Sequence, residues 1–174
     1  ALEHKLVDYN TKLLSQANTD VLTGLYNRRK AMEYLEELLI PSNHHFTSIC
    51  ICDIDFFKKV NDNYGHDIGD IVLQTIARTM QTTLEKKCFI ARWGGEEFLL
   101  VFPSCNGDEA FCFLEELKRR ISALQFNADG TAFSVTMTFG LTEYDFRSDI
   151  DTAIKEADEK LYMGKKTGRN RMVF

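Results

Sequence analysis

Apolar and polar positions alternate along the chain with helical and strand-like periods. In the first seventeen residues, apolar side chains recur at intervals of four and three residues, which predicts a helix with a short apolar stripe. The stripe consists of Leu2, Leu6, Tyr9 and Leu13. It is too brief to establish a coiled coil. The helix is therefore either the end of a longer signalling helix or a helix that packs on the domain.

The remaining patterns predict helices and strands joined by short connections. Amphipathic stretches predict helices over residues 28–40, 67–85, 108–124 and 149–163. Apolar or alternating runs predict strands over residues 46–54, 89–93, 98–102, 133–141 and 171–174. Helices that flank one central sheet, in an α+β fold, suit this order of elements.

Composition narrows the class of protein. The chain has 174 residues, 44% of them hydrophobic and only two of them proline, which fits one folded domain and excludes a disordered chain. A net charge of −5 makes a general nucleic-acid binder unlikely on electrostatic grounds, because phosphate contacts need excess Lys and Arg. We expect no membrane span and no signal peptide. Five cysteines without a CxxC pair predict reduced, buried thiols rather than a zinc site.

The segment RWGGEEF at residues 92–98 lies between two predicted strands. A hairpin would therefore carry the adjacent carboxylates of Glu96 and Glu97 at its tip. Like charges side by side repel, and they add nothing to a core. The two glycines let a ligand approach the backbone closely. An acidic surface hairpin without a function is the alternative interpretation of this segment.

A second acidic segment stands at the end of the strand predicted over residues 46–54. It contains Asp53 and Asp55. Carboxylates that face the acidic hairpin would suit a hard divalent cation such as Mg²⁺, which prefers oxygen ligands and phosphates. A strand that simply leaves the core through solvated aspartates is the alternative.

Residues 160–174 carry five basic side chains and no acidic one. They are Lys160, Lys165, Lys166, Arg169 and Arg171. This local charge suits a polyanionic ligand such as a triphosphate. Basic residues that balance the macrodipole at a helix C-terminus are the alternative.

Together these segments resemble the GGDEF family, the diguanylate cyclases, from Asp20 onward. The matching stretches are DVLTGLYNRR at 20–29, DIDFFK at 53–58, ND at 61–62 with YGHDIGD at 64–70, the GGEEF variant of the signature at 94–98, and KKTGRN at 165–170. Five ordered matches at family-like spacing are far more specific than GGEEF alone.

The resemblance implies a fold and an activity. The fold is a central, mostly antiparallel five-stranded sheet flanked by helices, similar to nucleotide cyclases and the polymerase palm. The activity is that of a nucleotidyltransferase, which condenses two GTP into cyclic di-GMP and two pyrophosphates. The domain would cover residues 18–174, with residues 1–17 as the helix of an upstream linker. Since each domain would hold one GTP, we expect a site shared between two domains of a homodimer.

The resemblance also implies a catalytic set and a metal site. Asp53, Glu96 and Glu97 would form the catalytic set. Mg²⁺ or Mn²⁺ would be held by Asp53, Glu96 and the carbonyl of Ile54. Metal ions would lower the pKa of the attacking 3′-hydroxyl and neutralise the charge that develops on the phosphate.

Substrate contacts are implied in the same way. Asn61 and Asp70 would hold the guanine. An aspartate accepts both N–H donors of guanine but would face a ring-nitrogen acceptor in adenine, so this contact would select the base. Lys165 and Arg169 would bind the β- and γ-phosphates. The backbone of the remaining contact residues would also touch the triphosphate; these are Phe56, Phe57 and Lys58.

The chain departs from the family at a product-inhibition site. Many members carry RxxD five residues before the signature, where this chain has EKKC at residues 85–88. Because the arginine and the aspartate are both missing, we expect weak or absent feedback inhibition.

Two alternative functions stay open. One is a non-catalytic GTP-binding regulatory domain, against which the intact acidic and basic positions argue. The other is a cyclase of different base preference, which Asn61 and Asp70 would decide. As partners we expect GTP, a second domain and an upstream sensory or receiver module, but neither a nucleic-acid polymer nor direct membrane contact. We expect a cytoplasmic location, whether or not the parent protein is membrane-anchored.

Overall fold

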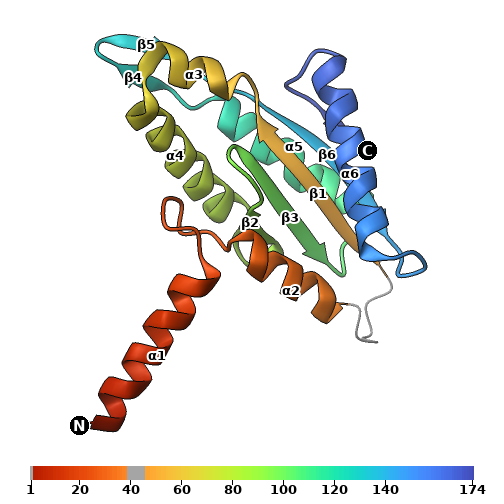
Figure 1. The fold of residues 1–174 in the computed structure, drawn as a ribbon. Coiled ribbons are helices and arrows are strands. Elements are labelled where there is room, and N and C mark those ends of the chain that lie inside the picture. Colours follow the sequence, from red (N-terminus) through yellow and green to blue (C-terminus); the bar gives the residue numbers. More distant parts are fainter. Residues whose placement is uncertain (1, 39–45) are drawn as a thin grey trace.

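A five-stranded sheet forms the centre of the protein in a computed structural model that describes residues 2–38 and 46–174 (Figure 1). The strands follow the order β2–β3–β1–β6–β7. Their bounds are Thr47–Ile54 for β1, Phe89–Arg92 for β2, Glu97–Pro103 for β3, Met137–Tyr144 for β6 and Met172–Val173 for β7. Strands β6 and β7 pair in parallel. The other neighbours in this sheet are antiparallel, which confirms the expected fold class.

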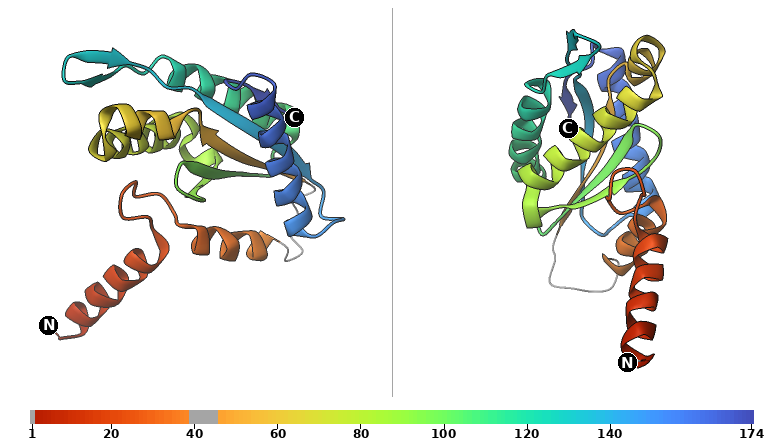
Figure 2. Two further views of the ribbon diagram at one scale, coloured as in Figure 1. Left: turned by 45° about the horizontal axis from the view of Figure 1, so that its top comes forward. Right: turned by 90° about the vertical axis from the view of Figure 1, so that its left-hand side faces the viewer.

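Helices cover both faces of the sheet (Figures 1 and 2). Helices α4 (His66–Leu84) and α5 (Gly107–Ser122) pack on one face, and α2 (Arg28–Leu38) and α6 (Ile150–Lys166) pack on the other. A capping box fixes the start of α5, because Asn106 and Glu109 satisfy each other's backbone N–H groups. Helix α6 approaches β6 closely at Gly140, where a Cβ atom would lie 2.0 Å from a backbone oxygen of α6.

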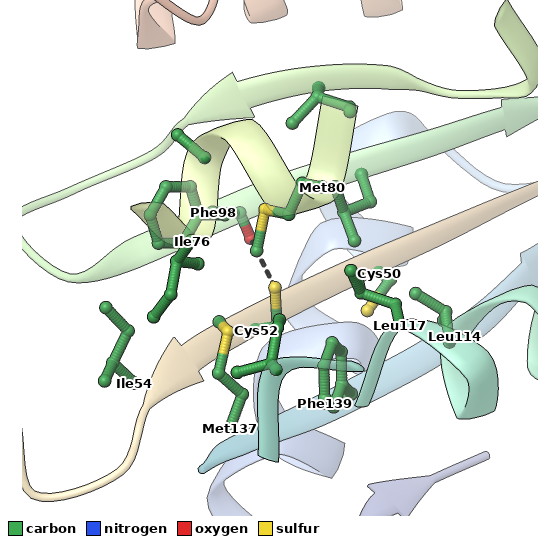
Figure 3. Close-up of a cluster of buried hydrophobic side chains, with 14 of the residues drawn as sticks. Cys50, Cys52, Ile54, Ile76, Met80, Phe98, Leu114, Leu117, Met137 and Phe139 are labelled. Atoms are coloured by element: carbon green, nitrogen blue, oxygen red, sulfur yellow. Dashed lines mark hydrogen bonds between the residues drawn. The ribbon is translucent and has the colours of Figure 1, made fainter. Parts of the chain in front are cut away.

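The central strand β1 is buried on both faces, and its side chains alternate between two cores. Cys50, Cys52 and Ile54 join the larger core beneath α4 and α5 (Figure 3). There the thiol of Cys52 donates to the carbonyl oxygen of Phe98 at 3.7 Å. All five cysteines are free, but Cys112 is exposed and Cys88 is only half-buried, so the prediction that all are buried is wrong for these two residues.

Two short elements are absent from the predictions. Helix α3 (Phe57–Tyr64) fills part of the polar stretch before α4, and the strands β4 (Phe126–Ala128) and β5 (Thr131–Phe133) form a hairpin. The strand predicted over residues 133–141 is wrong at its start. Phe133 ends the hairpin and stacks on Tyr64, with ring centroids 4.3 Å apart. The predicted end of the helix over 28–40 lies outside the described residues.

The first helix, α1 (Leu2–Asn18), extends away from the sheet (Figures 1 and 2). Its C-terminal end is tied to the domain, since the side chain of Asn27 donates to the Ala17 carbonyl at 2.9 Å. Further along the helix, Leu6 and Tyr9 are 64% and 63% exposed. The alternative in which its apolar stripe packs on the domain is therefore wrong. Within the described part of the chain, no helix combines the length and hydrophobicity needed to span a bilayer.

Candidate active site

The acidic hairpin is hydrogen-bonded to the end of β1. Glu97 begins β3 and lies opposite Asp53 in the antiparallel register. The carbonyl oxygen of Glu96 accepts from the backbone N–H of Ile54 at 3.2 Å. The turn itself closes when the N–H groups of Trp93 and Gly94 donate to the Glu97 carbonyl, at 2.8 and 3.2 Å. These bonds place the carboxylates implied by the sequence at one edge of the sheet.

Arg92 holds the same turn from outside, in a role that the sequence did not assign. Its guanidinium donates twice to the Gly95 carbonyl, at 3.1 and 2.8 Å, and forms an ion pair with Asp20 at 3.1 Å. Asp20 also accepts from the backbone and hydroxyl of Thr23, at 2.8 and 2.6 Å. Burial opposes ionisation of Asp20, but these hydrogen bonds and the Arg92 charge lower its pKa. The loop that follows α1 is thus connected to the acidic turn.

Asp53 and Lys165 meet as an ion pair, with Lys165 Nζ 2.9 Å from Asp53 Oδ2. Asp53 is only 6% exposed. Burial raises its pKa, contact with Lys165 lowers it, and the charges of Glu96 and Glu97 raise it again, to about 6 in total. The three acidic positions therefore act on each other electrostatically. Lys165, which the resemblance assigns to phosphate, contacts the carboxylate that it assigns to metal.

The donor set at this edge fits a hard divalent cation. Asp53 and Glu96 would supply carboxylate oxygens, and the Ile54 carbonyl would be a third oxygen donor. Within residues 2–38 and 46–174, no group of three or more His, Cys, Asp or Glu side chains is placed to hold a metal ion on its own. Mg²⁺ typically takes one or two carboxylates and completes its coordination with water and substrate phosphates, so a complete cage is not required. Burial is the main cause of the raised pKa of Asp53, and the charges of Glu96 and Glu97 add to it; a cation at this position would stabilise the ionised carboxylate against both.

A cleft of about 470 Å³ opens beside the acidic turn. Its lining brings together residues that the sequence assigned to guanine, triphosphate and metal, and adds Arg92, His66 and Leu73. The lining residues are Phe57, Lys58, Asn61, His66, Asp70, Leu73, Arg92, Gly95 and Glu96. Helix α3 carries the first three of them, so the helix missing from the predictions forms one wall of the cleft.

Asn61, a lining residue of this cleft, carries a buried acceptor. Its Oδ1 is buried and has no hydrogen-bond partner among the described residues. It lies against Gly69, where a Cβ atom would come within 1.9 Å of it, so only glycine leaves the Asn61 side chain this position. A buried acceptor without a partner costs free energy until a donor arrives. The N–H groups on the Watson–Crick edge of guanine are suitable donors.

Phe56 and Arg169 lie together at the start of α3. The guanidinium carbon of Arg169 is 4.4 Å from the centroid of the Phe56 ring, and Lys59 Nζ is 4.6 Å from the same ring. Phe56 precedes α3 in a left-handed conformation with φ 56°. The first N–H groups of a helix have no partner within it, so the backbone of Phe57 and Lys58 is available to an anion.

Comparisons of this chain with a family model and with known proteins indicate the same family. The family model described as "Diguanylate cyclase, GGDEF domain" matches residues 17–171. Diguanylate cyclase A of Treponema denticola is 33% identical over 173 residues, which cover 95% of this chain and 46% of that protein. The chain thus spans about half the length of this curated relative.

Solved structures agree with this family in three dimensions. Diguanylate cyclase SiaD of Pseudomonas aeruginosa, solved with its activator SiaC, superposes with a TM-score of 0.88 at 36% identity, over 99% of this chain and 67% of that chain. The coiled coil and GGDEF domain of DgcB from Caulobacter crescentus, solved with c-di-GMP, superpose with a TM-score of 0.91 at 27% identity, over 98% and 92% of the two chains.

Proposed function

The chain belongs to the diguanylate cyclase GGDEF domain family, and from this membership we propose that it condenses two GTP into cyclic di-GMP with release of two pyrophosphates. The observation that carries the proposal is the cleft in which Asn61 and Asp70 share walls with Glu96. The residues proposed to read the base and a carboxylate of the proposed metal site then line one space, as a nucleoside triphosphate requires.

Guanine would occupy the end of the cleft formed by Asn61 and Asp70. The orphaned Oδ1 of Asn61 accepts from the base, and the Asp70 carboxylate accepts from the paired N–H donors. An adenine would place an acceptor against this carboxylate and leave a polar group unpaired, which costs about 1–3 kcal/mol or more for a charged group. The cleft would therefore select GTP over ATP.

The triphosphate would extend toward the start of α3 and the basic side chains beyond it. Backbone N–H groups at Phe57 and Lys58 donate to phosphate oxygens, and the Arg169 guanidinium offers a fork of donors. Asp53, Glu96 and the Ile54 carbonyl would hold Mg²⁺ or Mn²⁺, which supplies charge neutralisation at the reacting phosphate and lowers the pKa of the attacking hydroxyl. Glu97 adds a further negative charge at this edge.

The attacking 3′-hydroxyl must come from a second GTP, so two domains would face each other across a twofold axis. The exposed apolar residues on α1 support such pairing through a second copy of this chain. They are Leu6, Val7, Tyr9, Leu13 and Leu14, each at least 45% exposed. We assign residues 1–17 to this pairing helix and residues 18–174 to the catalytic domain.

The experiment is incubation with GTP and Mg²⁺, followed by chromatography of the nucleotides. We expect cyclic di-GMP from the wild type and none from Glu96→Ala, which removes a carboxylate of the metal site. Glu159→Gln is the matched control, because Glu159 is an exposed carboxylate on α6. Asp70→Asn should narrow the preference for GTP over ATP. Turnover by Glu96→Ala at the wild-type rate would refute the assignment of the site.

The same assay separates the enzyme from a regulatory domain. A protein that binds GTP by calorimetry but forms no product at any concentration would be the non-catalytic alternative. If pairing limits the rate, turnover should rise more steeply than linearly with protein concentration. Leu6→Glu together with Leu13→Glu should then reduce turnover at low concentration. Turnover that stays linear for a protein shown by light scattering to be monomeric at the same concentrations would contradict the shared site.

A further inference from the structure

Asp55 has a surrounding unlike that of its neighbour Asp53. It is 4% exposed, and its two carboxylate oxygens accept three hydrogen bonds. Thr136 Oγ1 and Thr138 Oγ1 each donate at 2.6 Å, and the backbone N–H of Asn170 donates at 2.9 Å. The backbone N–H of Asp55 in turn donates to the Thr136 carbonyl at 2.9 Å.

These bonds join three segments that are distant in the sequence. The donors lie 81, 83 and 115 residues from Asp55 along the chain. Two belong to β6 and the residue just before it, and the third belongs to the loop after α6. Because the bonds already engage both oxygens, Asp55 is occupied as an acceptor within the protein itself. Asp55 therefore forms a clamp that connects β1 and β6 with the basic loop, which is the loop of residues 167–171 between α6 and β7.

The segments on both sides of this clamp are in conformations that L-residues rarely adopt. Phe56, directly after Asp55, has φ 56°. In the basic loop, Arg169 has φ 58° and Asn170 has φ 45°, after Gly168 at φ 125°. Such backbone persists only where surrounding contacts fix it. The bond from Asn170 to Asp55, with a second from the Arg169 N–H to the Gly164 carbonyl at 2.9 Å, supplies that fixation.

The two strained residues meet each other, since the Arg169 guanidinium lies over the Phe56 ring. We propose that Asp55 is a positioning residue, which holds the basic loop against β1 so that Arg169 stacks on Phe56 with its guanidinium set for the terminal phosphates of the nucleotide. This inference rests on the proposed function, because it concerns the triphosphate end of the same site. Asp55 itself contacts no substrate in this arrangement.

Asp55→Asn is the sharpest change, because it keeps the size of the side chain. One carboxylate oxygen becomes an NH₂ group, which cannot accept from a hydroxyl or a backbone N–H. The oxygen that remains carries no charge, so each hydrogen bond that it accepts is weaker, and an NH₂ group on the Oδ2 side would face the Asn170 N–H, donor against donor. In either orientation the loop that carries Arg169 is held less firmly. We expect weaker binding of a guanosine triphosphate by tenfold or more. Binding of GMP, which lacks the terminal phosphates, should change less than twofold.

Calorimetric binding of 3′-deoxy-GTP and of GMP, each with Mg²⁺, measures this difference. The 3′-deoxy nucleotide has no attacking hydroxyl, so binding is read without turnover. In an Arg169→Ala background, Asp55→Asn should add less than a threefold further loss, because the residue through which it acts is gone. Equal losses for both nucleotides, or full additivity with Arg169→Ala, would overturn the proposal.

Two buried threonines on β6 provide a matched pair of variants. Thr138→Val removes one donor to Asp55 and should shift the ratio of the two affinities in the same direction by about threefold, the order expected for one weakened hydrogen bond. Thr142→Val removes a buried hydroxyl of the same strand that contacts Glu156 and Lys160 instead. It should lower the melting temperature without changing the ratio. An unchanged ratio in Thr138→Val would overturn the proposal even if Asp55→Asn did not fold.

This test is separate from the test of the proposed function. A protein that made no cyclic di-GMP but showed the selective, non-additive loss would refute the activity and support the role of Asp55. If the wild type made cyclic di-GMP and Asp55→Asn bound both nucleotides normally, the activity would be supported and the role of Asp55 refuted.

Discussion

The ionisation of Asp53 should make the stability of the protein depend on pH, and two opposing effects decide the direction. Burial and the charges of Glu96 and Glu97 raise its pKa, whereas the ion pair with Lys165 lowers it. The balance is a pKa of about 6 against an ordinary value of 3.8. Desolvation therefore outweighs the ion pair, as often happens when a charge is removed from water.

The sign of the pH effect follows from this shift. Between pH 6 and pH 4 the folded protein binds a proton at Asp53 that the unfolded chain does not yet bind, so acidification stabilises the fold. A difference of one unit between the pKa of Asp53 in the folded protein and its pKa in the unfolded chain corresponds to about 1.4 kcal/mol. Protonation of Asp53 should thus add about 2 kcal/mol to the free energy of unfolding between neutral pH and pH 4, where the unfolded chain begins to bind the same proton.

Comparison of the wild type with Asp53→Asn isolates this contribution. Urea denaturation without divalent cations, at intervals from pH 7.5 to pH 4, gives the free energy of unfolding of both proteins. Other titrating groups contribute similarly to each, so the difference between them reports Asp53. We expect the wild type to gain about 2 kcal/mol relative to the variant as the pH falls to 4. A difference that stays constant, or that shrinks in acid, would mean that Lys165 dominates and the reasoning is wrong.

Three further predictions concern the core, the cleft and the product. Phe98→Ala should lower the free energy of unfolding by about 3–5 kcal/mol in urea denaturation, because Phe98 is fully buried. Gly69→Ala should weaken GTP binding by about tenfold in calorimetry, since its Cβ would displace Asn61 and forfeit about one hydrogen bond. Micromolar cyclic di-GMP should leave GTP turnover unchanged in an inhibition assay, because residues 85–88 lack the arginine and aspartate of the product site; inhibition that Lys86→Ala or Lys87→Ala removes would contradict this.

Periodicity was sufficient for the large elements because each buries one face. The stretches that became α4, α5 and α6 carry apolar residues at helical spacing, and β1 reads as a continuous apolar run. Helix α3 escaped prediction because it buries only Phe57 and Val60. The β4–β5 hairpin escaped because its strands have three residues each, too few for a period to emerge.

The site was predictable where one motif supplies its own neighbours and unpredictable where distant segments meet. Glu96 and Glu97 adjoin each other in the chain, so their proximity needed no structure. The pair of Arg92 with Asp20 spans 72 residues, and neither residue alone signals the other. The Asp55 clamp likewise depends on how β6 and the last loop return to β1. The periodicity of apolar residues contains no information about contacts between segments that are distant in the sequence.

The pair of Asp53 and Lys165 suggests why metal and nucleotide should bind together. In the structure each charge has the other as its partner, 2.9 Å apart and largely out of water. Removing one partner from a buried ion pair leaves an uncompensated charge, which is costly. A cation that bound alone to Asp53 would leave Lys165 without its partner. A triphosphate that bound alone to Lys165 would likewise leave Asp53 without its partner. Arrival of both exchanges the two partners at once, so each ligand should favour the binding of the other.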